Sequence, residues 1–385
     1  MMKNSSISIQ TNRFVKLSIC LLLLLFSGWT IPNPNANFPD REVSLQEKIG
    51  EMILIGFRGT TLNPNMHVVD DIQKLGISGV ILFDYDVSSK SYKRNIENST
   101  QLKKLITDLH ALTERKIFVA IDQEGGKVNR LKERYGFPTT VSMKYIGKTD
   151  LEDTTRHYAH RTASLLKELG FNLNFAPCID LDMNPDCPVI GKIGRSIGID
   201  SAKVTRHALW WIEEHAKMGI LSCVKHFPGH GSSTVDTHLG IADITHSWSE
   251  TELAPYRQLI KANTIKMVMT SHIFHEGLDS EYPATMSPAI LTGILREQLG
   301  FEGVIISDDL AMGAMAENYS LENIIEKSIQ AGADLLCFSN NGKTYDPHIA
   351  QKAIDIILNL VKENKISEQR INESYQRIIA LKQSK

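Results

Sequence analysis

The chain has 385 residues, of which 42% are apolar, 22% are charged and 7% are aromatic. Its 42 Lys and Arg residues nearly balance its 44 Asp and Glu residues, giving a formal net charge of −2. Nucleic-acid binding favours a surplus of positive charge, and disorder favours a lower apolar content, so the composition argues against both classes. The length fits two average domains or one large α/β barrel with insertions.

Residues 1–36 have the composition of an export signal. Three basic residues precede a short apolar run at 17–26, which small and polar residues follow. A basic start, an apolar run shorter than the roughly 20 residues that span a bilayer, and a small-residue exit are typical of a secretory signal. We expect an exported protein, periplasmic or secreted, with 1–36 as a signal peptide or an N-terminal membrane anchor. Membrane contact is expected only through this segment.

After residue 45, eight short apolar segments alternate with longer amphipathic stretches. The segments are continuously apolar, which is typical of parallel strands buried on both faces. They are 53–57, 79–83, 117–121, 173–177, 221–226, 267–271, 304–307 and 335–338. Helices are predicted at 95–114, 201–218 and 321–331, and closing helices within 346–385. The alternation predicts an α/β fold, a TIM-type (β/α)8 barrel occupying 40–385 as one domain, with an open doubly wound sheet as the alternative.

Ionisable residues gather where the predicted strands end. Active sites of (β/α)8 barrels use the carboxyl ends of the strands and the loops that follow them. The residues at these positions are 122–124, Asp180, Asp182, Lys225, His226, Ser271, His272, Asp308 and Asp309. These residues follow or end five different predicted strands. Polar strand caps explain two such strand ends but not five, so we expect the active site at this rim.

The densest cluster is the sequence KHFPGHGSSTVDTH at 225–238. Its glycines, Gly229 and Gly231, predict a mobile and irregular loop backbone. One interpretation is a metal site with four ligands, His226, His230, Asp236 and His238. Against a metal, Lys225 adds a repelling charge and a mobile loop holds ligands poorly, so no metal is expected.

Proton transfer is the second interpretation of this cluster. Asp236 and His238 are two residues apart, close enough for the carboxylate to accept a hydrogen bond from one ring nitrogen. The other ring nitrogen can then give or take a proton near neutral pH. A second candidate is Asp308, which follows a buried apolar strand, the place for a positioned carboxylate nucleophile.

Four cysteines lie beyond residue 36: Cys178, Cys187, Cys223 and Cys337. Export permits disulfides, and Cys178 with Cys187 is the closest pair in sequence. Four unpaired, buried thiols are the alternative. No CxxC occurs, which argues against a zinc site of that kind.

Four motifs together resemble glycoside hydrolase family 3. They are IDQEGGKVNR at 121–130, GRSIG at 194–198, KHFPGHG with the following DTH at 225–238, and SDDLAM at 307–312. The similarity is greatest to the single-domain bacterial β-N-acetylhexosaminidase (β-N-acetylglucosaminidase) branch, and it covers about residues 45–345. DTH stands where DSH is commoner, and Ile197 stands where an aromatic residue is frequent.

The resemblance implies functional roles for individual residues. It implies Asp308 as the nucleophile and His238 as the acid/base with Asp236 as its partner. The implied sugar-binding residues are Asp122, Arg130, Arg195, Lys225 and His226. It implies no cofactor and, as partner, a glycan or muropeptide containing N-acetylglucosamine (GlcNAc).

The motifs therefore predict a retaining β-N-acetylhexosaminidase that removes terminal β-linked GlcNAc. A β-glucosidase or β-xylosidase of the same family is the alternative enzyme, although such relatives take their acid/base from a following domain for which we expect no room here. A catalytically inactive glycan-binding barrel is the alternative outside enzymes. The aglycone (peptidoglycan, chitin or another GlcNAc glycoside) and the oligomeric state stay open.

Overall fold

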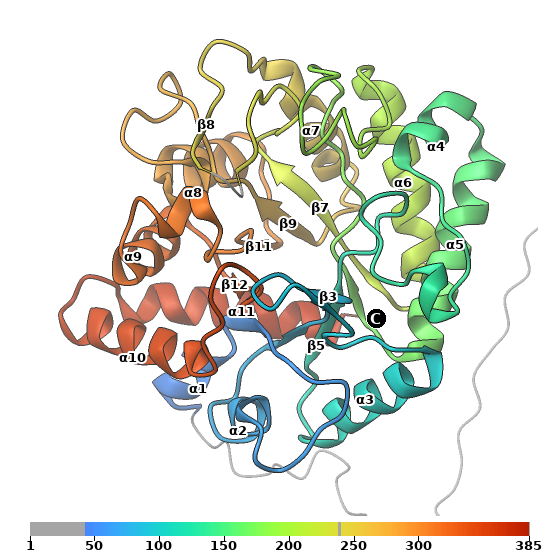
Figure 1. The fold of residues 1–385 in the computed structure, drawn as a ribbon. Helices are drawn as coiled ribbons and strands as arrows, with labels where there is room; N and C mark the ends of the chain where they lie inside the picture. Colours follow the sequence, from blue (N-terminus) through green and yellow to red (C-terminus); the bar gives the residue numbers. More distant parts are fainter. Residues whose placement is uncertain (1–42, 238–239, 385) are drawn as a thin grey trace, which may run out of the picture. The chain divides into compact units, whose positions relative to one another are not determined.

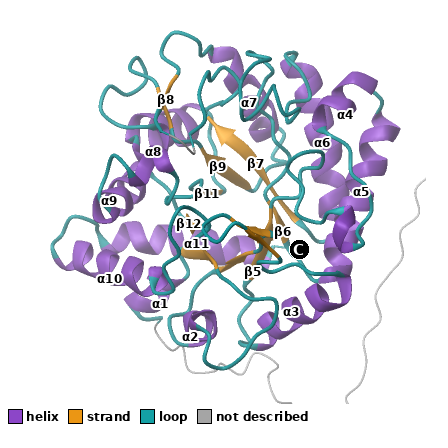
Figure 2. Cartoon of the chain, in the orientation of Figure 1, coloured by secondary structure: helices purple, strands orange, loops and turns teal. Residues whose placement is uncertain are grey.

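The computed structural model describes residues 43–237 and 240–384, and its centre is a ring of parallel strands surrounded by helices (Figures 1 and 2). The predicted export signal lies outside the described residues. The strands are β1 (Ile53–Gly56), β2 (Gly79–Ile81), β5 (Phe118–Ile121), β6 (Leu173–Asn174), β7 (Leu221–Phe227), β9 (Met267–Thr270), β11 (Val304–Ile306) and β12 (Leu336–Phe338). All eight predicted strands are therefore confirmed, several of them shorter than predicted.

The order of the strands is that of a barrel. Seven parallel pairings run in the order β11, β9, β7, β6, β5, β2, β1, β12. A single parallel bridge between Ile306 and Leu335 joins the two ends, and the Ser307 N–H donates to the Leu335 carbonyl at 3.0 Å. The result is a nearly closed eight-stranded barrel, so the predicted α/β barrel is confirmed and the open sheet is excluded.

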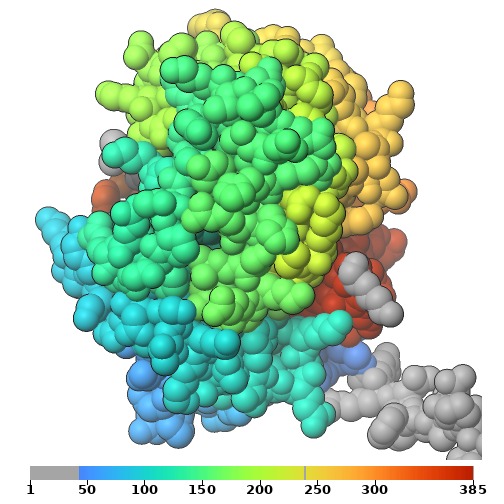
Figure 3. Space-filling model, turned by 90° about the vertical axis from the view of Figure 1, so that its right-hand side faces the viewer, coloured from blue at the N-terminus to red at the C-terminus, as the bar shows by residue number. Residues whose placement is uncertain are grey.

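Helices cover the outside of the barrel and its amino-terminal end. They are α1 (Leu45–Gly50), α2 (His67–Gln73), α3 (Ser99–Ala111), α4 (Met143–Thr149), α5 (Glu152–Leu169), α6 (Ser201–Lys217), α7 (Ala254–Lys261), the π-helical η4 (Ala289–Gln298), α8 (Gly313–Ala316), α9 (Leu321–Ala331), α10 (Ile349–Lys362) and α11 (Glu368–Gln383). Seen from the side, the face formed by α4 to α6 is closed by side chains apart from a small hollow (Figure 3).

Capping residues set where the longest of these helices begin and end. The Asp200 carboxylate accepts hydrogen bonds from the Ala202 and Lys203 N–H groups at the start of α6. Gly170 ends α5 with a φ of 96°, a conformation that glycine adopts without strain. The buried side of α6 includes Val204, Ala208 and Trp211, which pack in the single large core around the strands. These local signals place the helices against the barrel.

Two small sheets and three 3-10 turns lie in the connections between strands. The sheets pair β3 (Tyr85–Asp86) with β4 (Ser91–Tyr92), and β8 (Ala242–Asp243) with β10 (Ile273–Phe274). The turns are η1 (Glu133–Tyr135), η2 (Glu250–Leu253) and η3 (Ala284–Met286). Both sheets belong to loops that follow barrel strands, so they flank the carboxyl-terminal rim. No helix within 43–237 and 240–384 has the length and apolarity needed to cross a membrane.

Candidate active site

A chain of buried charges occupies the rim above β5 and β7. The Lys225 ammonium lies 2.7 Å from the Asp122 carboxylate and 2.7 Å from the Glu124 carboxylate. Lys225 contacts Oδ1 of Asp122, and Arg130 contacts Oδ2 of the same carboxylate at 3.3 Å. Arg195 donates two hydrogen bonds to the Glu124 carboxylate, of 2.7 and 2.9 Å. Three positive and two negative side chains from four segments of the chain thus form one connected network.

Burial and charge oppose each other in this network. Burial alone would raise the pKa of Asp122, but Lys225 and Arg130 outweigh it and hold the pKa below its ordinary value. Burial is likewise overcome at Glu124, where Arg195 and Lys225 lower the pKa to about 2. Burial would lower the pKa of Lys225, yet the two carboxylates raise it. All of these groups therefore stay ionised over the neutral pH range.

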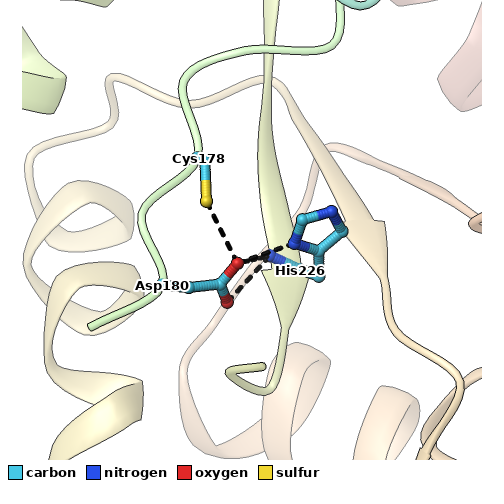
Figure 4. A group of neighbouring side chains, drawn as sticks. All are labelled: Cys178, Asp180 and His226. Atoms are coloured by element: carbon cyan, nitrogen blue, oxygen red, sulfur yellow. Dashed lines mark hydrogen bonds and ion pairs between the residues drawn. The ribbon is translucent and has the colours of Figure 1, made fainter. Parts of the chain in front are cut away.

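His226 is held from both sides of its ring. Its Nδ1 lies 2.6 Å from Asp180 Oδ2 (Figure 4). Its Nε2 lies 3.1 Å from the guanidinium of Arg195. A guanidinium only donates, so Nε2 accepts, and Nδ1 carries the proton that is donated to Asp180. Asp180 also accepts from the backbone N–H of His230 at 2.8 Å, and His226 and His230 keep its pKa well below the ordinary value despite burial. These contacts fix the orientation of the His226 ring.

Cys178, Asp180 and His226 are close enough to be considered as metal ligands. The Cys178 thiol donates to Asp180 at 3.2 Å, and burial raises its pKa well above the ordinary value. A metal ion here would have to displace both that proton and the Nδ1 proton of His226, with Arg195 against the same ring. The trio fits a hydrogen-bonded support for His226 better than a cation site.

The four cysteines beyond residue 36 are buried free thiols. Cys187 donates to the His230 carbonyl at 3.6 Å, and Cys178 donates to Asp180 as described above. Of the two alternatives drawn from the sequence, the structure has the unpaired thiols.

Asp308 lies at the carboxyl end of β11, where the apolar strand gives way to the rim. Its backbone N–H donates to the Thr270 hydroxyl on β9 at 3.3 Å, and its Oδ1 accepts the Asp309 N–H at 2.8 Å. Asp308 is half-buried, and its charge acts on the buried thiol of Cys223 together with that of Asp122. The predicted nucleophile and the charge network therefore face the same barrel interior.

Asp309 supports the backbone beside Asp308. Its carboxylate accepts the Ser339 and Ala311 N–H groups at 2.9 and 3.1 Å, and it also accepts the Ser339 hydroxyl. Its carbonyl accepts His272 Nε2 at 2.9 Å. Asp309 is therefore occupied by contacts that fix the turn after β11, which leaves Asp308 as the carboxylate presented at the rim.

The glycine-rich turn after β7 is closely packed. Residues 227–233 are all buried. Gly229 has a φ of 124° and any Cβ there would approach the Glu252 Cβ to 2.6 Å, while a Cβ at Gly231 would overlap the Leu181 carbonyl. Both glycines therefore serve close backbone approach, and the mobility expected of this loop stays a prediction.

The second half of this loop carries the predicted acid/base pair. Thr234 and Val235 are exposed, Asp236 is half-buried and Thr237 is buried. His238 lies outside the described residues, so its pairing with Asp236 stays a prediction. The Thr237 carbonyl accepts the Ala314 N–H at 3.1 Å, which ties this loop to the segment after Asp308.

The structure brings together all five predicted sugar-binding residues, but not equally at the surface. The Arg130 and Asp122 side chains keep 26% and 16% of their surface exposed, whereas Lys225 keeps 2%. The sequence places Glu124 and Asp180 at the rim but assigns them no role; in the structure they are the carboxylates that hold Arg195, Lys225 and His226. Their positions directly after buried strands were the available signal.

Comparisons with known proteins agree on one family. Residues 44–381 match the model described as the Glycosyl hydrolase family 3 N terminal domain. Over 352 residues the chain is 32% identical to Beta-hexosaminidase A of Pseudoalteromonas piscicida, covering 84% of this chain and 56% of that protein. It is also 32% identical to Beta-hexosaminidase of Hydrogenovibrio crunogenus, covering 78% of this chain and 81% of that protein.

A solved structure of this family has a similar fold. The family 3 β-N-acetylglucosaminidase of Paenibacillus sp. str. FPU-7 superposes with a TM-score of 0.80 at 31% identity. The match covers 89% of this chain and 62% of that protein. The chain thus spans somewhat more than half the length of the Pseudoalteromonas and Paenibacillus proteins.

Proposed function

Because this chain belongs to glycosyl hydrolase family 3, we propose that it is a retaining β-N-acetylhexosaminidase (EC 3.2.1.52). It removes terminal, non-reducing β-linked GlcNAc from cell-wall fragments or related glycans. The observation that carries the proposal is the oriented carboxylate of Asp308 at the mouth of a barrel whose rim also holds an ionised binding network. The names of the relatives support the choice of sugar.

Asp308 is the nucleophile in the proposed reaction. One of its oxygens is fixed by the Asp309 N–H, and its backbone is tied to Thr270 on the adjacent strand. Attack on the anomeric carbon forms a glycosyl-enzyme ester and breaks the bond to the leaving oxygen. A carboxylate held in this way loses little rotational freedom on reaching the transition state.

His238 is the acid/base, with Asp236 as its partner. As an imidazolium it donates a proton to the departing oxygen, and as a neutral imidazole it then takes a proton from the water that cleaves the ester. Many retaining enzymes use two carboxyl groups for these roles. A histidine becomes neutral after donating, so it adds no second anion beside Asp308.

Asp122 and Arg130 are the members of the charge network best placed to meet a sugar. Both keep part of their side chain exposed, and Lys225 holds Asp122 from below. We assign direct contacts with sugar hydroxyls to Asp122 and Arg130. Lys225, Arg195 and His226 also contact the sugar, and in addition they fix the charge and orientation of the network. Ionised partners of this kind orient the substrate before the reaction.

Turnover of a matched substrate panel tests the proposed activity. The purified protein is assayed with 4-nitrophenyl β-GlcNAc, 4-nitrophenyl β-glucoside and 4-nitrophenyl β-xyloside. A kcat/KM highest for the GlcNAc compound supports the proposal. Preference for the glucoside or xyloside supports the alternative enzyme, and binding of GlcNAc without turnover of any compound supports an inactive glycan-binding barrel.

We further propose that the protein is exported through residues 1–36 and that residues 40–385 form the catalytic domain. The support is the basic and then apolar composition of the first segment. Cell fractionation with N-terminal sequencing tests this. A periplasmic, secreted or membrane-attached protein is expected, and a cytosolic protein that retains its first residues would contradict it.

A further inference from the structure

Thr237 is a buried residue in an exposed stretch of loop. Thr234 and Val235 before it are exposed and Asp236 is half-buried, whereas Thr237 keeps only 3% of its surface accessible. Threonine has no strong tendency to bury itself in a surface loop, since its hydroxyl must then find a partner. Its burial therefore indicates an anchor point.

The anchor consists of two hydrogen bonds in different directions. The Thr237 hydroxyl lies 3.2 Å from Nε2 of His230, and the Thr237 carbonyl accepts the Ala314 N–H at 3.1 Å. His230 is itself fixed, because its backbone N–H donates to Asp180 at 2.8 Å. That carboxylate also holds His226. Thr237 is thus connected to the sugar-binding rim on one side and to the segment that follows Asp308 on the other.

The His230 ring that contacts the Thr237 hydroxyl does not change its charge near neutral pH. Burial, helped by the neighbouring His226, lowers the pKa of His230 to about 4. His230 is then neutral near pH 7 and is unsuited to accept and release protons in the reaction at that pH. Its side chain acts as a fixed hydrogen-bond partner for the loop.

We infer that the hydrogen bond between Thr237 and His230, the Thr237 latch, positions the acid/base loop relative to the nucleophile. The inference rests on the proposed function, since it gives this role to the residue between Asp236 and His238. Thr237 and His230 are positioning residues and transfer no proton themselves. The Thr237 backbone is also bonded to Ala314, six residues after Asp308 in the chain.

Loss of the latch has a specific kinetic consequence. A loop that leaves its place lowers the fraction of molecules with an acid in reach of the leaving oxygen. A sugar leaving group needs that proton, whereas nitrophenolate departs without it. A loosened latch should therefore slow cleavage of a disaccharide much more than the first step with an activated glycoside.

Three variants of one residue type test the latch. Thr237→Val keeps the shape but removes the hydroxyl, Thr237→Ser keeps the hydroxyl, and Thr234→Val makes the same chemical change at an exposed position of the same loop. We measure kcat/KM for 4-nitrophenyl β-GlcNAc and for a β-linked GlcNAc disaccharide. Thr237→Val should lose on the order of 10-fold with the disaccharide, as expected for one hydrogen bond, and about threefold or less with the nitrophenyl compound.

The other variants and added azide complete the expected pattern. Thr237→Ser should restore most of the disaccharide activity, and Thr234→Val should match the wild type with both substrates. Azide should raise kcat of Thr237→Val with the nitrophenyl compound and yield a β-glycosyl azide, since an anionic nucleophile needs no base. A Thr237→Val variant that behaves like Thr234→Val would overturn the inference, as would equal losses on both substrates without an azide product.

A double-mutant cycle assigns the effect to the hydrogen-bonded pair. His230→Leu and Thr237→Val should each lower disaccharide turnover, and the double variant should be no worse than the more affected single variant. Additive losses would contradict the latch. Should His230→Leu fail to fold, the three threonine variants decide alone. A wild-type protein inactive on both GlcNAc substrates would refute the proposed function, which separates that failure from failure of the latch.

Discussion

Glu252 should make the stability of the protein depend on pH, and its replacement by glutamine isolates that effect. Glu252, in η2, keeps 1% of its surface exposed, and its Oε2 accepts the Gly231 N–H at 3.0 Å. Burial, with a contribution from Asp180, raises the pKa of Glu252 to about 7, from an ordinary value of 4.5. Glutamine keeps the size of the side chain and an acceptor for the Gly231 N–H while removing the titrating proton.

The magnitude and sign follow from proton linkage. One pH unit of difference between the folded and unfolded pKa corresponds to about 1.4 kcal/mol, so burying this carboxyl changes the unfolding free energy by ~3 kcal/mol. Because the folded state has the higher pKa, it binds the proton more tightly. The contribution of protonated Glu252 to the unfolding free energy is fully present below pH 4.5, and it is lost as the pH rises through 7.

Chemical unfolding of the wild type and of Glu252→Gln at pH 5 and pH 8 measures this directly. The free energy of unfolding of the variant relative to the wild type should increase by ~2.5 kcal/mol between the two pH values. Other titrating groups, such as Asp71, whose pKa burial also raises to about 7, are present in both proteins and cancel. Glu250→Gln, an exposed change in the same turn, is the matched control and should show no such increase. A difference that stays constant with pH would refute the assignment.

Four further predictions concern the rim. Asp308→Ala should fold normally but keep less than about a tenth of the wild-type kcat, which corresponds to a barrier change above roughly 1.4 kcal/mol. A larger residual kcat would show that Asp308 is not the nucleophile. His238→Ala should lose about 10²- to 10⁴-fold with a disaccharide but much less in the first step with a nitrophenyl glycoside, while equal losses would indicate a binding role. Asp236→Asn should show the same pattern more weakly in the same assays, and a normal disaccharide rate would remove it as partner. Lys225→Met should lower the unfolding free energy by about 1 to 3 kcal/mol, since Asp122 and Glu124 each lose a buried hydrogen-bonding partner and keep only Arg130 and Arg195, respectively, and a change below 1 kcal/mol in urea unfolding would contradict that charge balance.

The positions of the barrel strands could be predicted because their sequences are continuously apolar. A run such as 304–307 is buried on both faces in a barrel, and no amphipathic alternation competes with this interpretation. The ends of the strands were less predictable. The segment predicted at 173–177 pairs as a strand only at Leu173–Asn174, since apolar character continues into the buried loop that carries Asp180.

The partners within the site could be predicted only in part. Spacing along the chain placed Asp122, Lys225 and Asp308 at one rim, because all three follow or end parallel strands. It could not show that Glu124 rather than solvent balances Arg195, since those residues are 71 positions apart. The glycines were an ambiguous signal, because Gly229 and Gly231 are compatible with an open loop and with close packing, and only the positions of Glu252 and Leu181 reveal the close packing.

Trapping of the glycosyl-enzyme shows which residue attacks the sugar. The protein is incubated with 5-fluoro-β-GlcNAc fluoride, whose good leaving group permits the first step while the ring fluorine slows the second, and is then digested and analysed by mass spectrometry. We expect one added 5-fluoro-GlcNAc group on Asp308, and no adduct in Asp308→Ala. An adduct on Asp309 or another residue, or turnover of 4-nitrophenyl β-GlcNAc with inversion of the anomeric configuration and no adduct, would contradict it.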